Sequence, residues 1–299
     1  MQTCIKTNRL IKRYGAEAAV NGVNLSVPEG AVYGFLGPNG AGKTTTLKML
    51  LGLVHPSEGR IWLFNQAMNA KNRLPLLRQV GSLIEAPSYY GHLTARENLE
   101  IVRSLRQLPK NEIDAALRTV RLEHTGSKAV SKFSLGMKQR LGIAAALMGK
   151  PKLLLLDEPT NGLDPAGIQE MRELIRSLPG EYGMTVVVSS HLLSEIDQIA
   201  DHVGIIRHGE LVFQDTLSAL HALSTRNLAL RTDDNGRTAL LLSGEEKDGY
   251  VFLPYQADES AAKLSRLLAQ NGIGVVRMEE KQEKLEDIFL AMTGTEADA

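Results

Sequence analysis

A glycine-rich run near the N-terminus carries the clearest chemical pattern in the chain. It fits G-x-x-x-x-G-K-[ST], a loop whose backbone N–H groups surround the phosphates of a nucleotide. In such a loop Lys43 reaches the β- and γ-phosphates and Thr44 offers its hydroxyl to Mg²⁺. The run predicts a nucleoside triphosphate site, against the simpler alternative of a glycine-rich turn that binds nothing. Its residues are Gly37, Pro38, Asn39, Gly40, Ala41, Gly42, Lys43, Thr44 and Thr45.

Two acids and a histidine follow two further apolar segments. Asp157 and Glu158 come directly after four consecutive leucines, and His191 follows the valine-rich run 185–190. Asp157 is placed to hold Mg²⁺ through a water, and Glu158 is the candidate to polarise an attacking water. Taken alone, either acid has the alternative of a helix cap or a turn residue. Together, downstream of a phosphate loop, they predict a hydrolytic site.

Buried parallel strands are the elements that must position these groups. Residues 31–36 predict a strand before the loop, and residues 43–51 a helix after it. The leucine run 153–156 is typical of a strand buried on both faces, as in a parallel sheet covered by helices. Ligands of open parallel sheets gather at the carboxyl ends of the strands, so the loop, the acids and His191 should converge.

These motifs give the chain a resemblance to the ATP-binding subunits of ABC transporters over residues 3 to about 224. Their L-S-G-G-Q signature corresponds to Phe133-Ser134-Leu135-Gly136-Met137, in which Leu135 and Met137 depart from the consensus. Ser134 predicts a helix N-cap, and a helix N-terminus favours anions. The resemblance implies that this signature contacts the γ-phosphate of the ATP bound to a second subunit, so that two ATP molecules are bound between two copies.

The resemblance implies roles for four other places in the chain. The loop Asn161-Gly162-Leu163-Asp164 would touch the second subunit, and His191 would contact the γ-phosphate. Tyr14 would stack on adenine, with a core tyrosine as the alternative. Glu85 stands where the family has a glutamine that reaches Mg²⁺ and faces the membrane subunit. An ionised glutamate only accepts hydrogen bonds, so we expect Glu85 to couple metal occupancy to loop position, or to be merely an interchangeable polar residue.

One branch of the family resembles this chain most. Glu85, the segment 85–99 and the run Ser134–Arg140 are similar to the ATP-binding subunits of bacterial exporters that protect against lantibiotics and bacitracin-like peptides. The resemblance implies a Mg²⁺-dependent ATPase at the cytoplasmic face of the membrane. It would work with a second ATP-binding subunit, most simply an identical copy, and with separate transmembrane permease subunits.

Composition sets limits on the alternatives. The 299 residues include 34 basic and 34 acidic side chains, a balance that argues against a nucleic-acid partner. Cys4 is the single cysteine, which excludes an internal disulfide. No apolar stretch approaches the roughly 18–20 residues of a spanning helix, and the N-terminus lacks a signal-peptide pattern. We therefore expect a soluble cytosolic chain that acts at a membrane only through other chains.

The predicted fold is α/β: a P-loop NTPase core of the ABC ATPase type with an N-terminal β lobe and a helical subdomain, followed by a small α+β domain. Residues 1–224 form the ATP-binding domain, with the helical subdomain at 85–150. Residues 225–299 carry 9 basic and 14 acidic side chains and form the accessory domain.

Individual elements are predicted as well. In the helical subdomain, Thr94 and Asn111 should cap helices. The segment 201–212 should form a hairpin that turns at His208-Gly209. In the accessory domain, the sequence predicts strands at 227–232, 238–243, 250–254 and 273–278 and helices at 257–271 and 285–292.

Two other functions remain open from the sequence. A soluble ABC ATPase acting on a non-transport macromolecule would share the same motifs, although the single phosphate loop and the short spacing to the signature favour a transporter subunit. A non-catalytic binding module conflicts with the presence of Asp157, Glu158 and His191 together.

Overall fold

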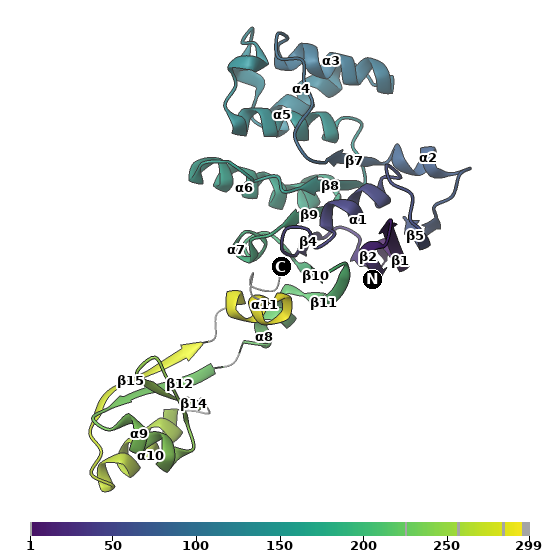
Figure 1. Cartoon of the computed structure of the whole chain (residues 1–299). Coiled ribbons are helices and arrows are strands. Elements are labelled where there is room, and N and C mark those ends of the chain that lie inside the picture. Colours follow the sequence, from purple (N-terminus) through teal and green to yellow (C-terminus); the bar gives the residue numbers. More distant parts are fainter. Residues whose placement is uncertain (1, 225, 256–257, 283–284, 295–299) are drawn as a thin grey trace. The chain divides into compact units, whose positions relative to one another are not determined.

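The computed structural model describes residues 2–224, 226–255, 258–282 and 285–294 (Figure 1). The chain divides into two compact units, Met1–Leu217 and Ser218–Ala299. No helix among the described residues combines the length and apolar character that a bilayer crossing requires.

A six-stranded sheet forms the centre of the first unit, in the order β11-β10-β4-β9-β8-β7. Strands β10, β4, β9, β8 and β7 pair in parallel, and β11 is an antiparallel edge strand. Every residue of β4, β8 and β9 is buried, which confirms the prediction of strands covered on both faces. The strands are β4 (Val32–Leu36), β7 (Val80–Leu83), β8 (Leu153–Asp157), β9 (Thr185–Ser190), β10 (His202–Arg207) and β11 (Glu210–Thr216).

Both faces of this sheet are covered. Helix α1 (Lys43–Leu50) contributes Leu47, Met49 and Leu50 to an apolar core shared with the antiparallel N-terminal lobe. Helices α6 (Pro165–Tyr182) and α7 (Leu193–Ile196) contact β4 and β9. The lobe has the order β2-β1-β5-β6, with β3 paired to β1. Its elements are β1 (Thr3–Tyr14), β2 (Glu17–Val23), β3 (Ser26–Pro28), β5 (Glu58–Leu63) and β6 (Gln66–Ala67), and helix α2 (Arg73–Leu77) follows it in the chain.

The segment between β7 and β8 is helical, as predicted: α3 (Ala95–Arg106), α4 (Asn111–Thr119) and α5 (Leu135–Leu147), with 3₁₀ turns at Glu123–Thr125 and Val130–Lys132. Thr94 caps α3 in a capping box with Glu97. The predicted cap at Asn111 is wrong. The chain already turns one residue earlier, because the Ile113 N–H donates to the Lys110 carbonyl oxygen, so Asn111 is the first helical residue.

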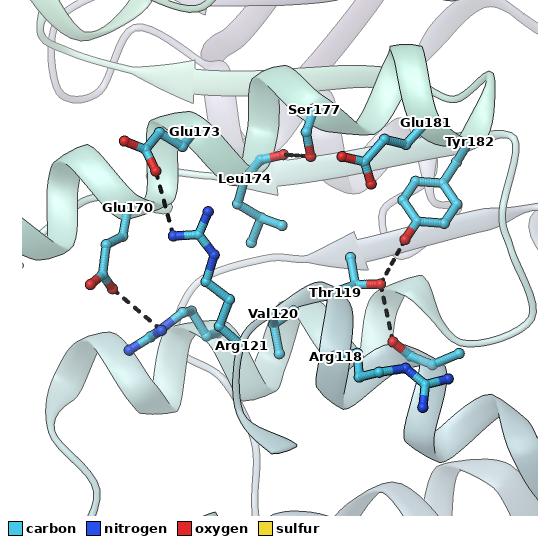
Figure 2. Close-up of a pocket in the computed structure, with 12 residues that line it drawn as sticks. Arg118, Thr119, Val120, Arg121, Glu170, Glu173, Leu174, Ser177, Glu181 and Tyr182 are labelled. Carbon is cyan, nitrogen blue, oxygen red and sulfur yellow. Dashed lines mark hydrogen bonds and ion pairs between the residues drawn. The ribbon is translucent and has the colours of Figure 1, made fainter. Parts of the chain in front are cut away.

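A pocket of about 460 Å³ lies between α4, α5 and α6 (Figure 2). Polar pairs bridge it: the Thr119 and Tyr182 hydroxyl oxygens are 2.8 Å apart, and Arg121 Nη1 lies 3.5 Å from Glu173 Oε2. Its lining shares no residue with the phosphate loop or the acids after β8. We therefore locate the chemistry elsewhere in this unit.

The second unit follows a β-α-β-β-α-β plan with the antiparallel order β13-β14-β12-β15. One side of its sheet packs Leu228, Leu230, Val251 and Leu253 against Leu268 of α10. The predicted helix 285–292 is present as α11. The elements are β12 (Arg226–Thr232), α9 (Asn235–Leu242), β13 (Glu245–Lys247), β14 (Tyr250–Pro254), α10 (Asp258–Gln270), β15 (Val275–Gln282) and α11 (Leu285–Thr293), preceded by α8 (Leu217–Ala222).

One predicted strand of this unit, 238–243, is wrong, because residues 235–242 form helix α9. Asp234 caps that helix by accepting from the Arg237 N–H at 2.9 Å, and the Thr238 hydroxyl donates to the Asp234 carbonyl oxygen. The leucines that suggested a strand also have a high helix propensity, so the cap decides between the two structures.

Candidate functional site

The glycine-rich loop joins β4 to α1, the strand–loop–helix setting that its pattern predicted. Gly42 has φ +105°, and a Cβ at this position would lie 2.4 Å from the Ala19 carbonyl oxygen. A Cβ at Gly37 would lie 2.3 Å from the Ile206 carbonyl oxygen. Only glycine fits these two positions, because one needs a left-handed backbone and both need close approach to other backbone.

Lys43 is held inside this loop. Its ammonium group donates to the carbonyl oxygens of Gly37 at 2.7 Å and Pro38 at 3.1 Å, and its side chain is 5% exposed. Glu158 Oε1 lies 3.6 Å away. Burial lowers the pKa of Lys43, and the nearby Glu158 carboxylate opposes that shift. The loop therefore contains a desolvated cation, a group suited to bind phosphate oxygens.

Asp157 ends β8 with both carboxylate oxygens engaged. The Thr44 hydroxyl donates to Oδ2 at 2.8 Å, and the Ser189 hydroxyl of β9 donates to Oδ1 at 2.5 Å. A carboxylate and a hydroxyl are oxygen ligands of the kind that Mg²⁺ prefers. Among the described residues no group of three or more His, Cys, Asp or Glu side chains could hold a metal. A Mg²⁺ here would take its remaining ligands from phosphate oxygens and water, as is usual for this ion.

Glu158 adopts a left-handed backbone, with φ +47°. Its N–H donates to the Ser189 hydroxyl at 3.0 Å and to the Ser189 carbonyl oxygen at 3.2 Å. Its Oε1 lies 3.4 Å from the buried Nδ1 of His191, which makes no hydrogen bond to the described residues. A non-glycine residue at positive φ costs on the order of 1 kcal/mol and marks a place where the surroundings fix the backbone. The turn holds the Glu158 carboxylate between Lys43 and His191.

Four side chains of this edge were missed by the sequence reasoning. Ser189 binds Asp157, while Ser190 and Thr160 donate to the buried carboxylate of Glu195 at 2.8 Å each. The serines had a readable signal, because two hydroxyls end a strand that is otherwise Thr-Val-Val-Val. Thr160 and Glu195 had none, since only the folded chain brings residues 35 positions apart together.

The signature segment caps α5 as predicted. The Ser134 hydroxyl accepts from the Met137 N–H at 3.3 Å. Leu135 is exposed, with its Cδ2 3.0 Å from where a Cβ on Gly162 would lie, and a Cβ on Gly136 would lie 3.7 Å from Leu163. The signature therefore packs on the loop Asn161–Asp164. No hydrogen bond or ion pair of the described residues joins Ser134 to the phosphate loop within this chain.

Tyr14 and Glu85 occupy the borders of the site. Tyr14 ends β1 with 53% of its surface exposed and Lys12 Nζ 5.0 Å from its ring centroid, which excludes the core alternative. Glu85 has φ +62°, is 65% exposed and accepts from Lys48 Nζ at 2.5 Å. That hydrogen bond raises the pKa of Lys48. Glu85 is thus paired with α1, and its predicted reach to Mg²⁺ stays a prediction.

Comparisons with known proteins agree with this geometry. Residues 20–161 match the ABC transporter family. The bacitracin transport ATP-binding protein BcrA of Bacillus licheniformis is 45% identical over 303 residues, 98% of each chain. The lantibiotic transport ATP-binding protein SrtF of Streptococcus pyogenes is 45% identical over 210 residues, which are 70% of this chain and 90% of SrtF.

Solved structures of the same kind superpose on this chain. The cbiO1 protein of Clostridium perfringens, part of an ABC transporter complex, gives a TM-score of 0.69 at 29% identity, covering 74% of this chain and 92% of cbiO1. A dimeric post-hydrolysis state of the ATP-binding cassette MJ0796, bound to ADP and Pi, gives 0.64 at 26% identity over 71% and 98% of the two chains. The chain belongs to the ABC transporter family as an ATP-binding subunit that hydrolyses ATP.

Proposed function

We propose that this chain is the ATP-hydrolysing motor subunit of an exporter of peptide antibiotics of the bacitracin or lantibiotic kind. The observation that carries the ATP-hydrolysing role is the convergence of Lys43, Asp157, Glu158 and His191 at the carboxyl ends of the core strands. The names of BcrA and SrtF, each 45% identical to this chain, support the class of substrate.

In the proposed mechanism the loop residues 37–45 wrap the phosphates of ATP and Lys43 balances their charge. Thr44 and Asp157 would hold Mg²⁺, which would supply positive charge to the phosphates when bound. Glu158 accepts the proton of the attacking water, and His191 donates to the γ-phosphate. Tyr14 lies exposed at the end of β1 and stacks on adenine. Removal of the base at Glu158 is expected to cost about 10²–10⁴ in rate.

A second ATP-binding subunit, most simply an identical copy, completes each site in this proposal. The partner's signature, residues 134–137, brings a capped helix N-terminus to the γ-phosphate, where a helix N-terminus favours negative charge. The exposed Leu135 and the loop Asn161–Asp164 lie together and would form part of that interface. The dimeric, ADP-bound form of the related cassette MJ0796 supports this arrangement.

The proposed partners also include separate transmembrane permease subunits, with this chain at the cytoplasmic face of the membrane. Residues 1–224 would act as the motor, with the helical subdomain 85–150, and residues 225–299 as an accessory domain. Glu85, beside Lys48, would couple metal occupancy to the loop that faces the permease. The alternative is an ABC ATPase that acts on a soluble macromolecule; the balanced charge argues against nucleic acid.

The test is co-purification. The tagged chain is extracted from membranes in mild detergent, and its stoichiometric partners are identified by mass spectrometry. Multi-span polypeptides are expected, and their loss from the complex should abolish resistance to the exported peptide in cells. Ribosomal or other soluble partners, with no multi-span chain, would overturn the transporter proposal and leave the ATPase chemistry in place.

A further inference from the structure

A buried glutamate behind the catalytic edge has no role in the mechanism above. Glu195 lies in α7, is 8% exposed, and accepts two hydrogen bonds on the same oxygen, Oε2. The donors are the hydroxyls of Thr160 and Ser190, each at 2.8 Å. Both donors are themselves buried. A buried carboxylate is costly unless hydrogen bonds satisfy it, so this arrangement constrains the segments that carry the two donors.

Those segments are the two that hold the catalytic candidates. Thr160 lies two residues after Glu158, and Ser190 lies one residue before His191. The carbonyl oxygen of Ser190 also accepts from the N–H of Gly37, at 3.3 Å, so the same residue contacts the start of the phosphate loop. The Glu195 carboxylate therefore joins the turn after β8 to the end of β9.

The proposed ATP hydrolysis depends on the spacing between the turn after β8, which carries Glu158, and the end of β9, which carries His191. Glu158 Oε1 and His191 Nδ1 lie 3.4 Å apart, and Asn161 Nδ2 donates to Glu158 Oε2 at 3.5 Å within the turn after β8. Because Glu158 and His191 follow different strands, their spacing also depends on how that turn is held against the end of β9. Glu158 sits at positive φ, a conformation that persists only where the surroundings hold it. One anchor is Ser189, which binds the Glu158 N–H. The link from Thr160 through Glu195 to Ser190 is the second, on the far side of the turn.

We propose that Glu195 is a positioning residue for ATP hydrolysis: it holds Glu158 and His191 in register by binding the Thr160 and Ser190 hydroxyls. This inference rests on the proposed roles of Glu158 and His191. Among the described residues no hydrogen bond or ion pair joins Glu195 to Glu158 or His191, and in this proposal Glu195 acts through the two hydroxyls. Misplacement of reacting groups by about 1 Å costs on the order of 10²-fold in rate, which sets the scale of the expected effect.

The first experiment compares steady-state hydrolysis by the full chain and its variants. Glu195→Ala should lower kcat by roughly 10–100-fold while ATP affinity changes less than about threefold, because the phosphate loop is intact. Glu195→Gln keeps an oxygen acceptor and should recover most of the loss. Thr160→Val removes one donor at constant shape and should give an intermediate kcat, which keeps the test decisive if Glu195→Ala folds poorly.

A matched control separates positioning from general destabilisation. Thr7 is buried in β1, and its hydroxyl donates to the Val23 carbonyl oxygen at 2.8 Å and accepts from the Leu25 N–H at 2.7 Å. Thr7→Val should lower the melting temperature about as much as Thr160→Val does and leave kcat unchanged. Equal kcat for both variants would overturn the proposal.

The second experiment is a double-mutant cycle. If Glu195 acts through His191, the fold-loss of kcat in the double variant Glu195→Ala/His191→Ala should be smaller than the product of the two single fold-losses. Once His191 is absent, loss of the residue that positions it has less left to affect. Full multiplicativity would overturn the positioning role. The outcome is distinct from failure of the proposed roles of Glu158 and His191, which would appear as wild-type turnover in Glu158→Gln and His191→Ala themselves. Failure of the transporter proposal would appear in the co-purified partners instead.

Discussion

The core sheet of the first unit and the four-stranded sheet of the second place their polar residues in opposite ways. In the core sheet, β4, β8 and β9 run parallel, so the loop at Gly37, the acids at Asp157 and Glu158 and His191 all leave from one edge. In the second unit the strands are antiparallel, so successive strand ends lie at opposite edges.

The charged residues of the second sheet accordingly pair along its surface. Glu279 lies 2.9 Å from Arg277 and 3.5 Å from Lys281, and Arg226 lies 3.6 Å from Glu280. Such exposed pairs contribute little free energy. The comparison teaches that parallel strands bring the polar groups at their carboxyl ends to one site in this protein, whereas the antiparallel sheet of the second unit carries its charged pairs along its surface.

The largest expected effect comes from removing the proposed base, Glu158, at the carboxyl ends of the core strands. Glu158→Gln should reduce kcat about 10²–10⁴-fold, since the amide cannot accept the proton of water. ATP binding should persist, and the variant should elute as a dimer with Mg·ATP in size-exclusion chromatography. Glu173→Gln on α6, whose partner is the exposed Arg121, is the control and should retain wild-type turnover. A Glu158→Gln enzyme with normal kcat would contradict the assignment.

The second unit allows the opposite test: its core is weakened by a mutation, and ATP hydrolysis by the first unit should be retained. Leu230 is fully buried in β12. Leu230→Ala should destabilise this unit by about 2–5 kcal/mol through lost burial and the cavity left behind. Differential scanning calorimetry should show an earlier transition for one unit only. ATP turnover below half of the wild-type value would show that the two regions are not energetically separate.

Glu85 tests whether a charged residue at the border of the ATP site contributes to hydrolysis or only to coupling with export. Glu85→Gln removes the charge that pairs with Lys48, but both side chains are partly or largely exposed, so stability should change by less than about 0.5 kcal/mol. We expect hydrolysis by the isolated chain to stay within about twofold of wild type. Peptide export in cells should change, and unaltered export would count against a coupling role for the charge.

The smallest expected effect is on alkylation of the Cys4 thiol, which lies in the first unit and becomes reactive when that unit unfolds. Burial raises the pKa of the Cys4 thiol to about 11, so at pH 7 only about one molecule in ten thousand carries the reactive thiolate. Alkylation should be negligible in the native chain, should rise with pH, and should become fast on unfolding. In Leu230→Ala protection of Cys4 should be unchanged; rapid labelling there would mean that unfolding of the second unit spreads.

Much of this site was readable before the fold was known. The glycine-rich loop follows from residue types at fixed spacing, the acids and His191 from their places after apolar strand runs, and the expected role of His191 from the family resemblance. The strands that carry them were predicted as well, because a short leucine run that ends in acids downstream of a phosphate loop is typical of a buried parallel strand.

The failures occurred where local patterns were ambiguous. The leucines at 240–242 fit a helix as well as a strand, and the Asp234 cap selected the helix. Asn111 looked like a cap, but the chain began its turn at Lys110. In both places a hydrogen bond between near neighbours decided the outcome, against a hydrophobic pattern at 238–243 and against a capping preference at Asn111.

The sequence by itself determined that this chain has a nucleoside triphosphate loop, an acidic strand end and a helix-capping signature, because each is a local pattern with a local chemical reason. Only the tertiary structure decided that Lys43 lies 3.6 Å from Glu158, that Glu158 takes a left-handed turn, and that Glu195 binds Thr160 and Ser190. These are contacts between separate strands and helices, and their distances depend on how the parallel sheet packs rather than on any single segment.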